Sequence, residues 1–294
     1  MPRMEKAEVV QFLTPKKYML NGLWFGPARA KRVIVWVHGL GGSMFSSIGL
    51  RTAQNLVDKK TAFLVFNNRG FGVVNKTYSA KKSGEPLLAG AAHELFKDCV
   101  DDLRAAVLFA KQRGGREIFL GGHSTGCQKS IYYAHAMKAK AGIKGIILAA
   151  PVSDYAAAVS TVSKRKLAKA TAYARKMVKS GQKHALMPAK MLTKWSINDA
   201  QRFLSLYTPD SIETMFPYEQ PKNPARILGS IKHPILVLWA QKDQYADKPK
   251  EILAWFDAHI RAPRKLVLVP KVQHSFKGAE KMVASTIRAW MKSL

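Results

Sequence analysis

The chain has 294 residues, of which 47% are hydrophobic and 23% are charged, a composition typical of globular proteins that excludes collagen-like and disordered chains. The 48 lysines and arginines outnumber the 19 aspartates and glutamates and give a formal net charge of +29. Such a charge bears on solubility and on partners, such as nucleic acid, anionic membranes or acidic substrates, and does not determine the fold.

We recognise no secretory signal, membrane span or metal-binding motif in the sequence. Residues 1–14 carry four charged side chains and lack the apolar run of a secretory signal. No window approaches the ~20 apolar residues of a membrane span, so we expect no transmembrane segment and a cytoplasmic location. Cys99 and Cys127 lie in stretches with helical patterns and form no CxxC or Cys/His motif. We therefore expect reduced thiols, no metal and no organic cofactor.

Short apolar runs alternate with helical patterns along most of the chain. The expected strands cover residues 9–13, 18–25, 33–37, 62–66, 118–120, 143–149, 235–239 and 265–269. The expected helices cover residues 47–59, 94–113, 125–140, 250–260 and 279–292. Continuous apolar runs are typical of strands buried on both faces, and strand–helix alternation favours a parallel sheet between two helical layers. The sequence therefore predicts an α/β fold with a mostly parallel central sheet.

The alternation stops after Pro151 and resumes near Ser230, and we interpret this stretch as a helical insertion over the sheet. The predicted organisation is thus a core built from residues 1–151 and 231–294, with residues 152–230 inserted as a cap, hereafter the cap segment. Ligands of open α/β sheets bind at the edge where such an insertion begins and ends.

Residues 164–183 of the cap segment contain eight basic and no acidic residues. Leu167, Ala170, Ala174 and Met177 follow one another at helical spacing, which predicts an amphipathic helix. Two interpretations of its basic face remain open. The face is either simply solvated, or it attracts anionic surfaces or substrates.

The pentapeptide Gly122-His123-Ser124-Thr125-Gly126 is the most informative motif. It directly follows an expected strand and precedes an expected helix, which is the strand–turn–helix context of a nucleophilic serine. The turn is so tight that side chains in place of the two glycines would collide with neighbouring backbone. We predict Ser124 to be a catalytic nucleophile.

A serine hydroxyl needs a general base, which in turn needs an acid to fix its tautomer and stabilise its cation. His274 follows the last expected strand and Asp243 follows the one before it, in the chain order Ser, acid, His. We predict that both are catalytic. Asp247 is the rival acid, with a helix-capping role as its structural alternative.

The oxyanion formed on attack needs preorganised hydrogen-bond donors. One is expected to be the backbone N–H of Thr125, at the start of a helix whose dipole favours negative charge. The other is expected from the loop 38–43, with Leu40 favoured and Gly41 as the alternative donor.

These residues resemble the α/β-hydrolase superfamily, through His38-Gly39, Asn68-Arg69-Gly70-Phe71-Gly72, the Ser124 pentapeptide, Asp243 and His274. A narrower likeness to fungal siderophore esterases is carried by residues 122–128, 202–206, 215–216 and 242–245. The resemblance implies an α/β-hydrolase fold and ester hydrolysis by the triad.

Three functions are compatible with the sequence. The favoured one is a carboxylic-ester hydrolase that acts through an acyl-serine on a small-molecule ester. The basic charge of the chain is compatible with an anionic substrate. The same triad also serves acyl transfer to an acceptor other than water. A catalytically silent fold that binds nucleic acid or membranes is the third, but a binding module has no need of a complete and correctly ordered triad, so no nucleic-acid partner is expected.

Overall fold

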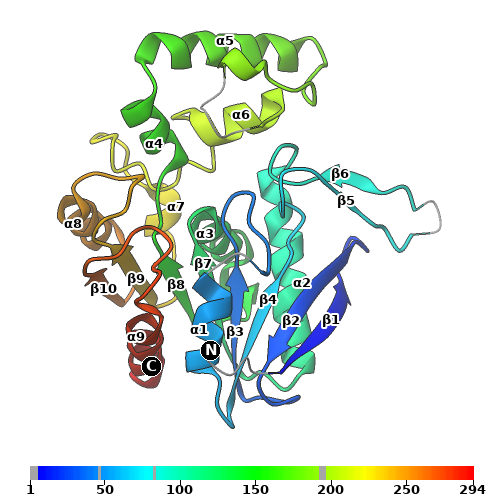
Figure 1. The fold of residues 1–294 in the computed structure, drawn as a ribbon, viewed down its shortest axis with the longest axis vertical. Helices are drawn as coiled ribbons and strands as arrows, with labels where there is room; N and C mark the ends of the chain where they lie inside the picture. The colour runs from blue at the N-terminus through cyan, green and yellow to red at the C-terminus, as the bar shows by residue number, and fades with distance from the viewer. Residues whose placement is uncertain (1–5, 46–47, 82–83, 192–196) are drawn as a thin grey trace.

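The computed structural model describes residues 6–45, 48–81, 84–191 and 197–294. Its central sheet has eight strands in the order β1-β2-β4-β3-β7-β8-β9-β10 (Figure 1). They are β1 (Ala7–Leu13), β2 (Met19–Phe25), β3 (Arg32–Val37), β4 (Thr61–Phe66), β7 (Glu117–His123), β8 (Gly145–Ala149), β9 (Ile235–Ala240) and β10 (Arg264–Val269). From β4 to β10 every neighbouring pair is parallel, whereas the β1–β2 and β2–β4 pairs at one edge of this sheet are antiparallel. The predicted α/β fold with a mostly parallel sheet is confirmed.

Helices cover both faces of this sheet, because alternate residues of each central strand point into two separate apolar clusters. One cluster joins Val33 and Val35 to the buried sides of α2 (Cys99–Gln112), α3 (Thr125–Met137) and α8 (Pro249–His259). The other joins Ile34 and Trp36 to α1 (Ile48–Leu56) and α9 (Glu280–Lys292). Both cysteines are free and buried within the first cluster, as their apolar surroundings in the sequence suggest.

Three local details differ from the sequence-based expectation. The helix expected from residue 94 begins as a 3-10 turn (Phe96–Asp98) and becomes α-helical at Cys99. The helix expected to reach residue 140 ends as α3 at Met137 and continues as a 3-10 turn (Lys138–Ala141), since Lys138 has a positive φ of 50°. A small two-stranded sheet of β5 (Asn75–Thr77) and β6 (Leu87–Ala89) was not predicted.

The cap segment leaves the sheet after β8 and returns to it at β9. It contains α4 (Asp154–Thr161), α5 (Lys164–Lys179), a 3-10 turn (Ala189–Met191), α6 (Ala200–Tyr207) and α7 (Arg226–Gly229). Figure 1 shows α5 and α6 as a separate layer at one end of the molecule, with α4 leading to them from the sheet. The stripe predicted on α5 packs inward, with Ala170 and Ala174 buried beside Phe203 and Leu206 of α6.

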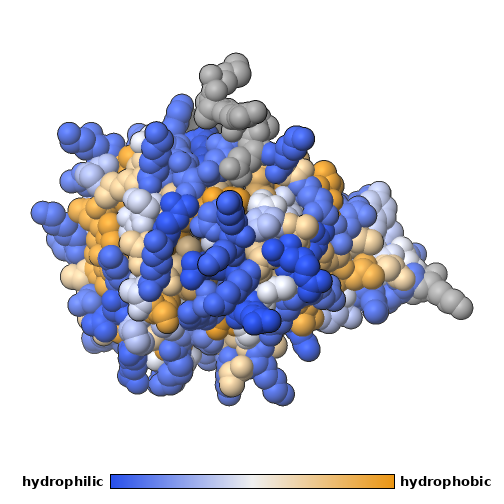
Figure 2. Space-filling view, turned by 90° about the horizontal axis from the view of Figure 1, so that it is seen from below, coloured by the Kyte–Doolittle hydropathy of each residue, from blue (hydrophilic) through white to orange (hydrophobic). Residues whose placement is uncertain are grey.

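The part of the cap segment after α6 behaves differently, because Met215, Phe216 and Leu228 belong to the main apolar cluster of the core. The helical layer of α4, α5 and α6 therefore has its own small apolar cluster, whereas residues 215–228 pack against the sheet's helices. Hydrophilic side chains cover most of the opposite end of the molecule, with apolar residues in scattered patches (Figure 2). Among the described residues, no helix combines the length and apolarity that crossing a membrane requires.

Candidate active site

Ser124 lies in the turn between β7 and α3, with φ of 54° and ψ of −127°. A positive φ is uncommon and strained for a residue with a side chain, and it persists only where the surroundings enforce it. The Ser124 N–H donates to the Ala149 carbonyl of the neighbouring strand at 3.0 Å, which holds the turn against β8. Strain of this kind concentrates at functional sites.

The two glycines of the pentapeptide are required by close backbone approach. A Cβ placed on Gly122 would lie 2.3 Å from the carbonyl carbon of Gly126. A Cβ placed on Gly126 would lie 2.3 Å from the Val37 carbonyl oxygen at the end of β3. Both distances are far below van der Waals contact, so any larger residue would displace α3 from the sheet.

His274 and Asp243 form a buried pair on the loops that follow β10 and β9. His274 Nδ1 lies 2.7 Å from Asp243 Oδ2, and the Asp243 side chain is 0% exposed. The second carboxylate oxygen of Asp243 accepts the Tyr245 N–H at 3.0 Å. A histidine that donates through Nδ1 keeps Nε2 as its free, basic nitrogen.

Asp247 takes no part in this pair. Its side chain is exposed, and α8 begins with Lys248 as the N-cap residue without a side-chain cap, so Asp247 does not cap α8 either. Of the two acids that the sequence left open, Asp243 is the one that contacts His274.

His123 connects the serine turn to the histidine loop. Its Nε2 lies 2.9 Å from the His274 carbonyl oxygen, and the two ring centroids are 4.7 Å apart. Burial, together with the nearby His274, lowers the pKa of His123 to about 4. His123 is therefore neutral at physiological pH and donates its Nε2–H to the carbonyl, with no charge to oppose a cation on His274.

The loop after β3 lies against Ser124. A Cβ placed on Gly39 would be 2.9 Å from Ser124 Cβ, so the backbone at Gly39 lies beside the serine. Thr125 is the first residue of α3, where N–H groups lack intrahelical acceptors. The side chain of Leu40 packs against the apolar cluster of α5 and α6. Each predicted donor is thus next in sequence to a residue of this contact, Thr125 to Ser124 and Leu40 to Gly39.

Arg69 and His38, which also carry the resemblance, make contacts that indicate structural roles. Arg69 is buried in ion pairs with Asp98, Asp101 and Asp102, the closest being 2.7 Å to Asp102. His38 lies 2.9 Å from the Gly39 carbonyl through Nδ1, and burial with nearby Lys129 lowers its pKa to about 4. His38 is therefore uncharged, and Arg69 stabilises the loop after β4.

A buried chain of charges behind the site was not predicted. Lys129 of α3 pairs with Glu94 at 2.5 Å, Glu94 pairs with Arg202 of α6 at 3.1 Å, and Arg202 pairs with Glu213 at 2.5 Å. Burial favours the neutral Glu94 carboxyl, but Lys129 and Arg202 outweigh this and lower its pKa. In the sequence Lys129 lies between Gln128 and Ser130, so no apolar pattern marks it as buried.

Neither of two concave regions of the structure is lined by Ser124, Asp243 or His274. One, of about 780 Å³, is lined within residues 209–227. The other, of about 300 Å³, is lined by Arg69, residues 87–89, His93, Glu94, Leu95, Asp98, Cys99, Asp102 and His184. The candidate active site therefore rests on side-chain geometry and sheet topology.

Comparisons with known proteins agree with this architecture. A family model described as "Protein of unknown function (DUF1749)" matches residues 30–291. No curated protein sequence gives a significant match.

Several solved structures share the whole fold at low identity. DcsB, solved in complex with its substrate analogue, has 12% identity and a TM-score of 0.69, with 98% of this chain and 99% of that chain covered. The α/β hydrolase GrgF from Penicillium sp. sh18 has 14% identity and a TM-score of 0.65, with 98% of both chains covered. Est1E from Butyrivibrio proteoclasticus, solved with ferulic acid bound, has 15% identity and a TM-score of 0.65, with 97% and 98% covered. At such identities the likeness establishes the α/β-hydrolase fold alone.

Proposed function

This chain belongs to the DUF1749 family, and we propose that it is a carboxylic-ester hydrolase that forms an acyl-enzyme at Ser124. The observation that carries the proposal is the buried Asp243–His274 pair, 2.7 Å long, on the same edge of the sheet as the strained Ser124. The parallel strands β7, β9 and β10 all end at this edge. Contact between the rings of His123 and His274 brings the two loops together.

The reaction begins when Ser124 Oγ attacks the ester carbonyl carbon while His274 Nε2 takes the hydroxyl proton. Asp243 stabilises the resulting imidazolium through Nδ1–H. The oxyanion accepts hydrogen bonds from the N–H groups of Thr125 and Leu40, and the start of α3 adds its dipole. Collapse of the intermediate breaks the ester C–O bond, and the His274 proton passes to the departing alcohol.

Deacylation repeats these steps with water as the nucleophile. His274 takes a proton from water, the hydroxide oxygen bonds to the acyl carbon, and the serine oxygen leaves with the proton that His274 returns. The products are an alcohol and a carboxylic acid. All groups needed are side chains and backbone of this chain, so the proposed mechanism uses no cofactor.

Substrate choice is assigned to the cap segment, which we propose covers Ser124. Leu40 supports this arrangement, because it follows Gly39, which adjoins Ser124, while its side chain packs against the α5–α6 cluster. The resemblance of residues 122–128 and 242–245 to fungal siderophore esterases makes a hydroxamate-type ester one candidate substrate. Aryl and simple alkyl esters are the others, and a p-nitrophenyl panel of increasing acyl length run beside them would rank the three.

The decisive test is covalent labelling by a fluorophosphonate probe. Labelling and turnover should both disappear in Ser124→Ala and persist in Ser285→Ala, an exposed serine on α9. Labelling that survives in Ser124→Ala would refute the assignment of the nucleophile.

The acid is tested by a matched pair of variants. Asp243→Asn should lower kcat by a factor on the order of 10⁴, because the amide cannot support the required tautomer and cation of His274. Asp247→Asn should retain nearly full activity, since its carboxylate lies outside the pair. Ester turnover at saturating substrate measures both, and the opposite ranking would make Asp247 the acid.

A further inference from the structure

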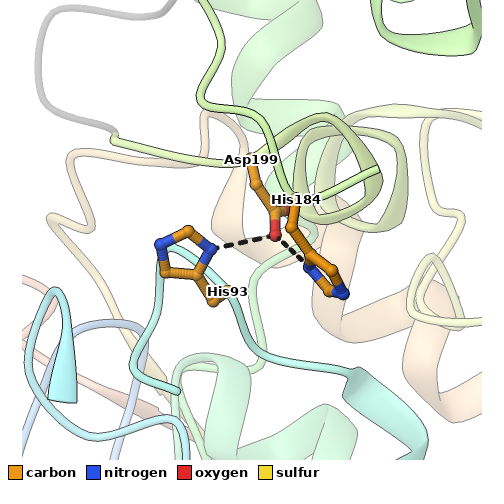
Figure 3. A group of neighbouring side chains, drawn as sticks. All are labelled: His93, His184 and Asp199. Carbon is orange, nitrogen blue, oxygen red and sulfur yellow. Dashed lines mark hydrogen bonds and ion pairs between the residues drawn. The ribbon is translucent and has the colours of Figure 1, made fainter. Parts of the chain in front are cut away.

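We propose that His93, His184 and Asp199 bind a divalent transition-metal ion, with Zn²⁺ the best fit, and that this ion fastens the cap segment to the core. Figure 3 shows the three side chains converging on one carboxylate oxygen. Nδ1 of His93 lies 3.0 Å and Nδ1 of His184 lies 2.9 Å from Asp199 Oδ2. One ligand atom from each residue lies within 4.8 Å of the other two.

The donor set suits zinc. Two imidazole nitrogens and a carboxylate oxygen are common zinc ligands, and three protein ligands leave a fourth position for water. With metal–ligand bonds of ~2.0–2.1 Å, tetrahedral ligand atoms stand about 3.3 Å apart, so each N···O distance would widen by about 0.3–0.4 Å. The ligand atoms now lie within 4.8 Å of one another, so the two imidazoles would also have to move closer together when the ion binds.

The proton on each Nδ1 must move before that nitrogen can bind a metal ion. Each ring now donates Nδ1–H to Asp199, and Figure 3 shows both Nε2 atoms on the sides of the rings away from this carboxylate. In a neutral imidazole the proton can move to Nε2 and free the Nδ1 lone pair for the metal, with no change in the charge of the ring.

The carboxylate is held in place by its surroundings, as a metal ligand requires. Asp199 is fully buried, and its Oδ1 accepts the Arg202 N–H at 2.7 Å as the N-cap of α6. This leaves Oδ2 for the two histidines. The His93 side chain is 8% exposed, whereas that of His184 is 48% exposed and offers a path from solvent.

The carboxylate of Asp199 is the charge available to a metal ion here. The cavity of about 300 Å³ beside the two histidines is also lined by Glu94, Asp98 and Asp102, but these acids pair with Arg69, Lys129 and Arg202. Asp199 has no lysine or arginine ion pair among the described residues, and its charged partners there are the two histidines.

The position of the group defines its role. His93 belongs to the loop after β6 in the core, whereas His184 and Asp199 belong to the cap segment. Asp199 N–H already donates to the Ala92 carbonyl at 2.8 Å, so the two parts meet here. A metal bound to all three would add coordinate bonds across this junction. None of the three ligands belongs to the proposed triad, so the inference does not depend on ester hydrolysis.

The test is Zn²⁺ titration of the metal-stripped full chain by isothermal calorimetry. We expect one Zn²⁺ per chain, at least tenfold weaker binding in His184→Gln and in Asp199→Asn, and unchanged binding in His135→Gln. Asn keeps the capping oxygen of α6, and His135 is a partly buried histidine of α3 whose ring contacts Ser230 and Tyr132, outside the proposed metal site. The melting temperature should rise with Zn²⁺ concentration in the unmodified chain and much less in His184→Gln.

Two outcomes would overturn the proposal. One is Zn²⁺ affinity that is equal in the unmodified chain and in both ligand variants. The other is binding that His274→Gln abolishes and His184→Gln retains, which would place the ion at the other histidine–aspartate pair. Co²⁺ provides a second readout, because tetrahedral coordination gives an intense visible spectrum that His184→Gln should remove. Circular dichroism of each variant checks that a lost signal is not a lost fold.

Discussion

Arg202 offers a quantitative test of the buried ion pairs around α6, one with Glu94 of the core and one with Glu213 of the cap segment. Its guanidinium is 0% exposed and lies between two carboxylates, 2.5 Å from Glu213 and 3.1 Å from Glu94. Glu94 has a second partner in Lys129 at 2.5 Å. Arg202→Met keeps an apolar stem of similar length and removes the charge, so it separates the ion pairs from the packing of α6.

The expected loss follows from what each carboxylate retains. Breaking a buried ion pair by removing one partner costs roughly 3–5 kcal/mol, because a charge is left buried and uncompensated. Glu94 keeps Lys129, whereas Glu213 keeps the Ser205 hydroxyl at 2.7 Å and loses its only cation among the described residues. We therefore expect Arg202→Met to lower the free energy of unfolding by about 4 kcal/mol, within the roughly 5–15 kcal/mol that folded domains possess.

Urea unfolding followed by circular dichroism measures this loss. The control is Arg175→Met on α5, whose pair with Asp210 is 3.6 Å long with both side chains exposed, and which should cost less than about 1 kcal/mol. Arg202→Met combined with Glu213→Gln should be more stable than Arg202→Met alone, because no unpaired carboxylate remains. Equal losses for Arg202→Met and Arg175→Met would refute the role given to the buried pairs.

Two further predictions concern catalysis. His123→Ala should lower kcat more than it changes KM, because the hydrogen bond that positions the His274 carbonyl is lost while the substrate contacts stay. An unchanged kcat in steady-state kinetics would contradict this positioning role. For an anionic ester, kcat/KM should fall as salt shortens the screening length from ~10 Å at 0.1 M to ~3 Å at 1 M, while a neutral ester changes little. Replacing Lys166, Lys169 and Lys176 of α5 by glutamine should make kcat/KM for the anionic ester less dependent on salt. Equal salt responses for the anionic and the neutral ester would mean that the basic face is only solvated.

The sequence predicts the central sheet well because its strands are buried on both faces. Every residue of β4 and β9 is buried, so these strands appear as continuous apolar runs. Ser124, Asp243 and His274 were chosen from the sequence because each follows a strand in a fixed chain order, and their catalytic roles stay a prediction. The structure adds the 2.7 Å contact that joins Asp243 to His274, and it leaves Asp247 exposed.

What the sequence did not predict depends on distant partners. β5 and β6 have three residues each, too few for a recognisable pattern. Arg202 and Glu94 are 108 positions apart in the chain, and His93 and Asp199 are 106 apart. A charged residue in a sequence does not reveal its partner at such separations. The buried ion pairs and the His93–His184–Asp199 group could therefore be found only from the fold.

Apolar clusters stabilise the sheet, whereas hydrogen bonds and ion pairs join α6 to the core, and the two kinds of contact have different consequences for function. The sheet is stabilised by large apolar clusters on both faces, which fix the strand ends that carry Ser124, Asp243 and His274. The helices α5 and α6 have a separate apolar cluster, and their junction with the core is built from directional contacts of Arg202 and Asp199. Hydrogen-bonded and ionic contacts set orientation more strictly than apolar burial does, because they fail when misaligned. We therefore expect substitutions at this junction to leave the Asp243–His274 pair unchanged and, under the proposed ester hydrolysis, to alter which substrates reach Ser124.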